Sequence, residues 1–478
     1  MEQRRSIGMF SRVLPFIAFA VVVLFSMVIP FDTDLGWHLR YGEYFIDHLS
    51  VLRANELTYF LDTYTWSHSY TLYQLMTSVL FNIGGIKALI IGYSLVIGGI
   101  FYAFFRIMRE QIHVAIVSFA VFSLLGLSTL SLGWRAQIFS VLFLLILFLV
   151  LRIINPVKRN VYLGVLFIVW VNVHGGFIVG LVIVGFDFVA KFWSGAKSDR
   201  IHLLIGFTTS IFATLLNPFG VYVYQEIIQH IWVPMATLIA EWVAPSVGAR
   251  VGYTVFSIWW VCVLIRSHNS AKVFWVMATT LVWYLAFSAR RNGVFVPLVF
   301  LVSLTEVYKN KITEFDKHEI TRIAVWIILG VGFIAEIFQL TSFSARLSNW
   351  EMYCSKGLVR YPCEIVKYLK QNPLPDQTRV FTLFEWGGFF EWQLPEYQYF
   401  VDGRMPAWKT DDGVSPYTTY LEIIQAKEGY DEKLRNYNTQ VIIMPSGTFL
   451  DLVLQKDPQG WKEVYRNSID VIYVVSKD

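Results

Sequence analysis

The sequence predicts an α-helical polytopic membrane protein with about 11 transmembrane helices and a small C-terminal extracytoplasmic α/β domain. Hydrophobic residues make up 55% of the 478 residues and charged residues only 15%, whereas a soluble chain carries about a quarter charged residues. Apolar runs long enough to cross, or nearly cross, a bilayer recur as far as residue 340. Beyond residue 345 the composition becomes that of an ordinary soluble domain, in which short strand-like runs alternate with helical ones.

The predicted spans follow directly from these apolar runs. Nine of them cover residues 10–30, 86–105, 113–131, 137–152, 201–216, 252–266, 272–288, 293–308 and 321–340. A further stretch, 161–190, is interrupted at Asn172-Val173-His174-Gly175-Gly176. Because a Gly pair with polar neighbours breaks a helix, we interpret this stretch as two short helices that meet at a turn. The total of roughly eleven crossings puts the two termini on opposite sides.

Lys and Arg residues predict the orientation. One set of connections holds more than twice as many of them as the opposite set, which marks the first set as cytoplasmic. The N-terminus is then cytoplasmic in a cell (plasma or inner) membrane, and the tail lies outside. The first run lacks a small-residue cleavage site before Asp32, so we interpret it as an anchor rather than a removed signal peptide. The predicted domains are a transmembrane domain over 1–344, with a first outer loop at 31–85, and an extracytoplasmic α/β domain over 345–478.

Both outer regions contain predicted elements. Residues 71–83 have helical apolar spacing, which indicates a helix lying along the membrane surface. In the tail we expect strands at 380–383, 399–401, 441–444 and 471–475, with helices at 417–428 and 447–456. Cys354 and Cys363 could form a disulfide outside the cytoplasm, and two free thiols are an equally acceptable interpretation.

The chemically useful polar residues fall on one side of the predicted membrane. Those at or near helix ends that face outward are Asp32, Asp34, His38, His68, Arg135, His174, Glu241, Arg290 and Arg291. Because an ionisable group at a membrane is costly, a one-sided cluster indicates a reaction centre at that face. The chain has no basic stripe and no zinc-ligand spacing, so nothing in it suggests nucleic-acid binding.

The sharpest motif is Asp32-Thr33-Asp34, directly after the first predicted helix. Two carboxylates separated by one residue can share a divalent metal such as Mg²⁺ or Mn²⁺, or one can act as a base that its neighbour positions. A structural alternative is that both residues merely end one helix and cap the next. The adjacent Trp37 and His38 favour the chemical interpretation.

Cations on the outward side suit an anionic ligand. Arg135 lies at an outward turn, and Arg290 and Arg291 lie between two apolar runs. A guanidinium can bind the phosphate or diphosphate of a lipid carrier through paired hydrogen bonds. Anchoring to lipid headgroups is the alternative for any one of these residues.

Two histidines have comparable alternatives. His174 lies at a helix break where Gly175 and Gly176 leave backbone N–H groups able to bind an anion, and a packed His at a plain turn is the alternative. His68 follows Trp66, a pair that could hydrogen-bond and stack on a sugar or could simply face solvent.

In their order, these motifs resemble those of the multi-pass GT-C glycosyltransferases, which include oligosaccharyltransferases, protein O-mannosyltransferases and aminoarabinose transferases. The matching features are the acidic motif after the first helix, the long first outer loop with its surface helix, roughly eleven spans and an outer α/β domain. Similarity to a bacterial group in that superfamily rests on Asp34-Leu35-Gly36-Trp37-His38-Leu39-Arg40-Tyr41-Gly42, Trp66-Ser67-His68, Val171-Asn172-Val173-His174-Gly175-Gly176 and Val401-Asp402-Gly403-Arg404. The resemblance covers nearly the whole chain.

The resemblance implies a membrane glycosyltransferase that moves a sugar from a polyprenyl-phosphate donor to an acceptor hydroxyl at the outer face, with inversion. The acceptor would be a glycan, a lipid or a protein. Asp34 is then the first choice for the general base and Asp32 the second. The implied phosphate-binding residues are Arg135, Arg290 and Arg291, and His174 is added to them because of its place at the helix break. The candidate substrate contacts, which the motifs themselves suggest, are Trp37, His38, His68, Glu241, Glu385 and Trp386.

The chain also departs from that superfamily's patterns. It lacks the Asp-Glu pair of O-mannosyltransferases and a clean Trp-Trp-Asp-x-Gly motif of oligosaccharyltransferases, although Phe384-Glu385-Trp386-Gly387-Gly388 occupies a comparable place. The acceptor therefore stays open. An alternative function is a non-catalytic or transport protein that handles lipid-linked glycans, such as a flippase or a protein like an O-antigen ligase or polymerase. A flippase would need polar groups across both leaflets, commonly with an internal repeat, and the sequence shows neither.

Overall fold

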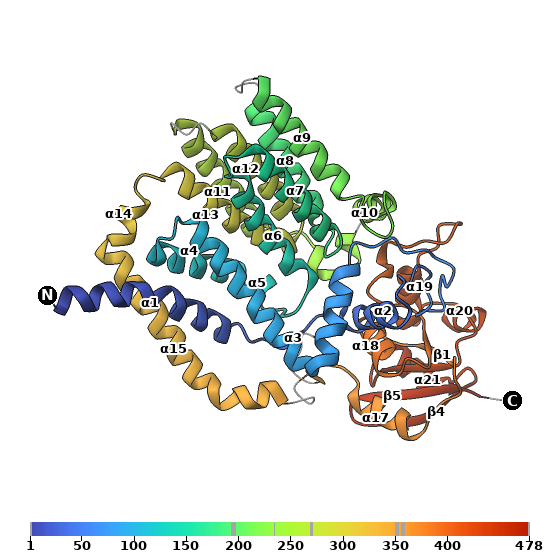
Figure 1. Cartoon of the computed structure of the whole chain (residues 1–478). Coiled ribbons are helices and arrows are strands. Elements are labelled where there is room, and N and C mark those ends of the chain that lie inside the picture. Colours follow the sequence, from blue (N-terminus) through green and yellow to red (C-terminus); the bar gives the residue numbers. More distant parts are fainter. Residues whose placement is uncertain are drawn as a thin grey trace. The chain divides into compact units, whose positions relative to one another are not determined.

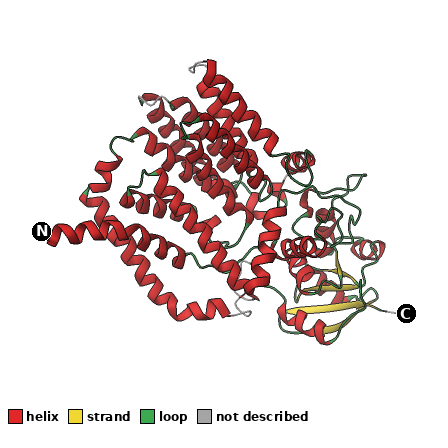
Figure 2. Ribbon diagram, viewed as in Figure 1, coloured by secondary structure: helices red, strands yellow, loops and turns green. Residues whose placement is uncertain are grey.

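The computed structural model describes residues 2–192, 197–233, 235–267, 271–348, 353–354 and 359–476. It is mostly helical, and the described residues form one five-stranded sheet near the C-terminus (Figure 2). The chain divides into two compact units. The helical unit contains Met1–Pro30, Gly84–Val221 and Ile239–Ser348, and the mixed unit contains Phe31–Ile83, Tyr222–Leu238 and Asn349–Asp478.

Every apolar run that the sequence predicts as a span contains a helix, with shifted ends (Figure 1). The helices of the helical unit are α1 (Glu2–Phe25), the later part of α3 (Thr71–Ile107), α4 (Ile112–Leu125), α5 (Leu127–Leu130), α6 (Ala136–Leu151), α7 (Pro156–Val171), α8 (Phe177–Phe192), α9 (Lys197–Ala213), α11 (Val247–Arg266), α12 (Lys272–Ser288), α13 (Phe295–Val307), α14 (Ile312–Lys317) and α15 (Glu319–Ser348). Among the described residues, α3 and α11 are long and apolar enough to cross a bilayer by length and composition alone. The number of crossings, about 11, stays a prediction.

The outward surface of the helical unit is apolar. On α11 the exposed side chains include Val251, Val255, Ile258 and Trp259, which recur at helical spacing along one face. A helix that turns such a face outward needs apolar surroundings, as in a lipid bilayer. The exposure pattern therefore indicates a membrane location.

Two helix breaks lie where the sequence predicts them. Helix α7 ends at Val171 and α8 begins at Phe177, so residues 172–176 form the predicted turn. In α3 the helical conformation fails at Gly84 and at Gly85, where φ is +60°. The second break separates residues 71–83, predicted as a surface helix, from the apolar run that follows. Glycine suits a positive φ because it has no Cβ to clash with the backbone.

The mixed unit joins helices to the sheet. Its helices are α2 (Leu35–His48), the first part of α3, α10 (Tyr222–Trp232), α17 (Cys363–Gln371), α18 (Phe384–Gln393), α19 (Pro416–Ile424), α20 (Tyr430–Asn436) and α21 (Phe449–Lys456). The strands are β1 (Arg379–Phe381), β2 (Gln398–Tyr399), β3 (Val441–Pro445), β4 (Trp461–Arg466) and β5 (Asp470–Val475), in the order β2-β1-β3-β5-β4. The β2-β1-β3 part is parallel, whereas β5 pairs antiparallel with both β3 and β4.

One aromatic core holds this unit together. Trp37, Tyr41 and Trp66 from the first outer loop pack in the same cluster as Phe400 and Trp408 from the tail. Helices α2 and α18 approach so closely that a Cβ at Gly36 would lie 1.7 Å from the carbonyl oxygen of Gly388. The first outer loop and the tail therefore fold as one body.

Cys354 and Cys363 form a disulfide across a sequence separation of 9. We expect Cys354→Ser with Cys363→Ser to lower the free energy of unfolding by about 2–3 kcal/mol, because the bond restricts the unfolded chain. Thermal unfolding in detergent without reductant checks this. Cys262→Ser is the control, since Cys262 is an exposed free thiol. An unchanged melting temperature in the double variant would contradict the expectation.

Candidate functional site

The acidic motif lies at the start of α2 in the mixed unit. Asp34 occupies the N-cap position, yet its side chain makes no capping hydrogen bond in the described structure. Instead, Trp37 Nε1 donates to Asp34 Oδ1 at 3.2 Å, and the Asp34 N–H donates to Asp32 Oδ1 at 3.3 Å. Asp32 is buried and Asp34 is half-buried. Helix capping therefore does not explain the position of the Asp34 carboxylate. Trp37, in the first turn of the same helix, orients it.

Aromatic rings and the two predicted histidines surround this motif. The ring centroids of Trp37 and His38 lie 3.6 Å apart, and those of Trp37 and Trp66 lie 5.3 Å apart. His38 and His68 are both buried. Burial, and then the charge of Arg404, lower the pKa of His68 to about 3, so this imidazole is neutral at physiological pH. These predicted substrate contacts lie inside an aromatic cluster.

Two tyrosines beside the disulfide interact electrostatically with the motif, and they were not identified from the sequence. Tyr353 and Tyr361 stack with ring centroids 5.1 Å apart, and both interact electrostatically with Asp32. Burial raises the pKa of both phenols, which keeps them protonated. The disulfide between Cys354 and Cys363 links the two segments that carry these tyrosines. The two cysteines were therefore the feature of the sequence that could have pointed to them.

The predicted cations meet in the helical unit. Arg135 makes a two-pronged contact with Glu241, with Nη1 2.8 Å from Oε2 and Nη2 3.2 Å from Oε1. Arg291 Nη1 donates to the same Oε1 at 2.7 Å, and its guanidinium lies 4.7 Å from the centre of the Trp242 ring. Burial alone would raise the pKa of Glu241, but Arg291 and Arg135 outweigh it and lower that pKa to about 2. Two guanidinium groups thus converge on one ionised carboxylate.

His174 joins this cationic cluster of Arg135, Arg291 and Glu241 through electrostatic interactions. The Gly176 N–H donates to His174 Nδ1 at 3.0 Å, and Ser140 Oγ lies 2.7 Å from the same nitrogen. Because Nδ1 accepts, we assign the ring proton to Nε2. The glycine pair thus orients the imidazole through a backbone donor.

Arg290 lies apart from the cluster. Its side chain is exposed, and its backbone N–H donates to the Val243 carbonyl oxygen at 3.1 Å. Of these two neighbouring arginines, Arg291 is the one whose side chain contacts Glu241 in the described structure.

The tail residues with a predicted substrate role are in α18. Trp386 is buried, and its indole Nε1 donates to the Arg360 carbonyl oxygen at 2.7 Å. Glu385 is half-buried and interacts electrostatically with Tyr417 and Tyr420. Gly387 and Gly388, which follow these two residues, are helical and buried in the mixed unit.

Glu226 on α10 is a second buried carboxylate that sequence reasoning did not identify. Tyr64 Oη donates to its Oε2 at 3.1 Å, and Trp408 Nε1 donates to its Oε1 at 3.3 Å. Burial raises the pKa of Glu226 to about 7, although both hydrogen bonds act in the opposite direction. On the same helix Ile231 and Trp232 are exposed, so α10 buries its acid and turns apolar side chains outward.

Because the folded state holds this proton more tightly than the unfolded state, stability falls as pH rises from about 4.5 to about 7. We expect Glu226→Gln to reduce this fall by on the order of 1–3 kcal/mol, since the amide cannot ionise. Melting temperatures in detergent at pH 5 and pH 8 measure the difference. Glu428→Gln, at an exposed position, is the control. The same pH dependence in Glu226→Gln and in the unmodified protein would contradict the expectation.

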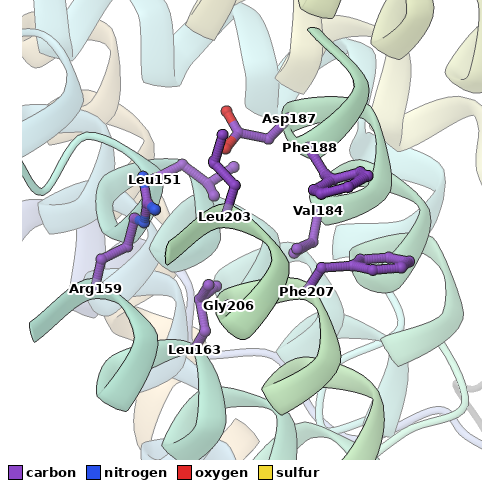
Figure 3. Close-up of a pocket in the computed structure, with 9 residues that line it drawn as sticks. All are labelled: Leu151, Arg159, Leu163, Val184, Asp187, Phe188, Leu203, Gly206 and Phe207. Carbon is purple, nitrogen blue, oxygen red and sulfur yellow. The ribbon is translucent and has the colours of Figure 1, made fainter. Parts of the chain in front are cut away.

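A small pocket in the helical unit contains none of the predicted site residues (Figure 3). Apolar side chains from α6, α7, α8 and α9 line most of it, with Arg159 and Asp187 as the charged members. Asp187 pairs with Lys191 at 2.5 Å, and Glu306 elsewhere pairs with Arg152 at 2.5 Å. Both acids form structural ion pairs.

A metal would have few protein ligands. Among the described residues, no three His, Cys, Asp or Glu side chains lie close enough to hold one ion together. The two carboxylates of Asp32 and Asp34 are the predicted ligands. Mg²⁺ is often held by one or two carboxylates together with substrate phosphate and water, so this pair fits such an ion only with the donor present.

No family model matches the chain, and no curated protein matches it by sequence. Solved structures do match its fold. The Archaeoglobus fulgidus oligosaccharyltransferase tethered with an acceptor peptide aligns with a TM-score of 0.55 at 12% identity, covering 98% of this chain and 74% of that one. Archaeal oligosaccharyltransferase AglB from the same organism, in complex with an inhibitory peptide and a dolichol-phosphate, aligns with a TM-score of 0.57 at 11% identity, covering 93% and 70%.

The chain has the fold of these archaeal oligosaccharyltransferases. The resemblance predicted from the order of the motifs is thereby confirmed at the level of the fold. A third similar structure is the Archaeoglobus fulgidus oligosaccharyltransferase in complex with Zn and sulfate, with a TM-score of 0.53 at 12% identity over 97% of this chain and 73% of that one. At this identity the match establishes the fold, and any activity rests on the residues described above.

Proposed function

We propose that this protein is a membrane glycosyltransferase that transfers a sugar from a polyprenyl-phosphate donor to an acceptor hydroxyl at the outer face of the membrane. One observation carries the proposal. In a chain with the fold of oligosaccharyltransferases, the first outer loop presents a carboxylate, Asp34, that is oriented by Trp37 and makes no capping bond. A carboxylate held by a neighbouring side chain is suited to accept a proton from a bound nucleophile.

The proposed topology has about 11 crossings, a cytoplasmic N-terminus and an extracytoplasmic tail over 345–478. The apolar outward faces of the helices support a membrane location. The disulfide supports an extracytoplasmic tail, because such bonds persist in oxidising compartments.

In the proposed reaction the acceptor oxygen attacks the anomeric carbon while Asp34 takes the hydroxyl proton. The new carbon–oxygen bond forms as the bond from the anomeric carbon to the phosphate oxygen breaks. The lipid phosphate leaves with both bonding electrons, and a single displacement inverts the configuration at that carbon. Asp32 accepts the Asp34 N–H and so fixes the start of α2.

Arg135 and Arg291 are proposed to hold the charge that develops on the leaving phosphate. Together they carry two positive charges against the single charge of Glu241, so the cluster attracts a further anion. Preorganised cations of this kind stabilise a transition state because they need not reorient as charge develops. His174, with its proton on Nε2, adds a neutral donor.

A divalent ion, when bound, would neutralise part of the phosphate charge, and Asp32 and Asp34 are the residues that would hold it. The proposed partners are a polyprenyl-phosphate sugar, membrane lipid and an acceptor. Among the similar structures, one oligosaccharyltransferase is described with an acceptor peptide and AglB with a dolichol-phosphate. Those ligand classes support a lipid-linked donor and make a peptide one acceptor class to test.

The test is transfer of a labelled sugar from a synthetic polyprenyl-phosphate donor to acceptors in membranes that contain the protein. We expect label in a glycan, lipid or protein pool that is absent from membranes without the protein. Movement of intact labelled donor across the bilayer with no covalent transfer would overturn the proposal in favour of a flippase. Glycan profiling of a deletion strain would then identify the natural acceptor.

A further inference from the structure

The turn Asp402-Gly403-Arg404 follows β2 in the mixed unit and is stabilised by an unusually buried arginine. Arg404 Nε lies 2.9 Å from each Asp402 carboxylate oxygen, and the Arg404 N–H donates to Asp402 Oδ1 at 2.8 Å. Both residues are almost completely buried. Because a buried charge is costly unless it is paired, this turn has a strong preference for one conformation.

Arg404 also binds the first outer loop. Its Nη1 donates to Tyr41 Oη at 2.5 Å, and its Nη2 donates to Asn55 Oδ1 at 2.9 Å. The rings of Tyr41, Trp66 and Trp408 lie 5.3–5.7 Å from its guanidinium carbon. These contacts fix the turn against α2 and the loop that follows it.

A second acid beside the turn adds no competing negative charge. Glu391 is fully buried, with Oε1 4.0 Å from Arg404 Nη2. Burial and the neighbouring Asp402 raise the pKa of Glu391 well above its usual range, which keeps it protonated. Asp402 is therefore the acid that pairs directly with Arg404.

Gly403, in the middle of this turn, faces the acidic motif. A Cβ at Gly403 would lie 2.0 Å from Asp34 Oδ1 and 3.2 Å from Trp37 Nε1. The Asp34 carboxylate thus occupies the space that any other side chain at position 403 would fill. The turn and the Trp37 indole therefore both lie next to the same carboxylate oxygen.

We propose that Asp402-Gly403-Arg404 is a positioning turn for the Asp34 carboxylate. Arg404 anchors the turn to the first outer loop, and Gly403 leaves the room in which Asp34 is held against Trp37. The inference rests on the proposed function, in which Asp34 is the base. It explains why a glycine is followed by a fully paired arginine at this place in the tail.

Gly403→Ala is a selective probe of this arrangement. The atom that its methyl group would approach most closely, Asp34 Oδ1, is the end of a rotatable side chain, so the carboxylate can swing away while the backbone stays in place. Trp37 Nε1, at 3.2 Å, would have to give by only a few tenths of an ångström. At Gly387, by contrast, a Cβ would lie 2.2 Å from the backbone oxygen of Val401, and the fold itself would have to shift. The two glycines therefore separate a displaced carboxylate from a disturbed core.

We expect Gly403→Ala in the full-length protein to lower kcat by about 10- to 100-fold, because small displacements of a catalytic group are costly. The donor KM and the melting temperature in detergent should stay within error. Gly252→Ala is the matched control, since a Cβ there meets nothing within 4 Å. Full kcat in Gly403→Ala, with Asp34→Asn inactive, would overturn the positioning role alone.

A double variant tests whether the effect passes through Asp34. In the Asp34→Asn background, adding Gly403→Ala should change the residual transfer rate by less than about twofold. Independent, multiplying losses would show that Gly403 acts elsewhere and would overturn the inference. Full activity of Asp34→Asn by itself would overturn the proposed base and, with it, this role for the turn. Arg404→Lys, which cannot make the same set of hydrogen bonds, should lose both kcat and thermal stability.

Discussion

Asp34→Asn is expected to lower the rate of sugar transfer by about 10²–10⁴-fold, the usual range for loss of a general base. The amide has nearly the shape of the carboxylate and can still accept the hydrogen bond from Trp37 Nε1, but it cannot take a proton from the acceptor. The variant should therefore fold and enter the membrane normally. Initial rates with a labelled donor, normalised to the amount of folded protein, measure the effect.

Asp47→Asn is the matched control because Asp47 lies on the same helix at an exposed position. It should transfer sugar at the rate of the unmodified protein. If Asp32→Asn is inactive while Asp34→Asn keeps full activity, the base is Asp32, which is the second sequence-based candidate. Comparable activity of all three variants would exclude an acid in this motif as the base.

Arg291→Ala and Arg135→Ala should each lower kcat by about 10²–10³-fold, the loss typical of removing one preorganised group that stabilises developing charge. Each variant leaves Glu241 with one guanidinium instead of two, so the attraction for a phosphate falls. Steady-state rates across a range of donor concentrations would separate the effect on kcat from that on KM.

Arg290→Ala provides the comparison for Arg291→Ala. The two residues are adjacent and carry the same charge, but the Arg290 side chain is exposed and lies outside the described contacts with Glu241. A much smaller loss is expected for Arg290→Ala. Equal losses would indicate a general electrostatic attraction of donor to the surface rather than a bound phosphate.

The helices and their interruptions were predictable from the sequence because their cause is local. Apolar runs form helices, the Gly175-Gly176 pair separates α7 from α8, and Gly84 and Gly85 interrupt α3. The predicted strands at 380–383, 399–401, 441–444 and 471–475 correspond to β1, β2, β3 and β5 with shifted ends. Local patterns thus predict elements well where burial follows the period of the element.

Elements without such a pattern were missed. Strand β4 is largely exposed, so it carries no apolar run, and it owes its pairing to β5. Helix α18 contains Gly387 and Gly388, which are poor helix formers. Gly388 allows close packing on α2, and Gly387 allows close packing on Val401 and Asp402. In both cases a tertiary partner, rather than local propensity, selects the structure.

Individual candidate residues could be proposed from the sequence, but the contacts between them could not. Their predicted position on the outer side of the membrane singled out Asp34, Arg135, Arg291 and Glu241 as candidates. It could not show that Glu241 accepts bonds from both arginines, nor that Arg404 binds Tyr41 and Asn55. Such pairings join positions separated by 50 to 363 residues, and one sequence carries no periodic signal for contacts at that range.

The shared core of the first outer loop and the tail has a consequence for biosynthesis. Residues 31–83 leave the ribosome long before residues 349–478, by roughly 15–50 s at ordinary rates of translation. Throughout that interval Tyr41, Asn55 and Trp66 have no arginine to bind, and the surroundings of Asp34 are unfinished. The proposed transfer activity should therefore arise only after the tail has been synthesised. A chain that ends before Arg404 should insert its helices into the membrane but should lack a correctly positioned Asp34 carboxylate.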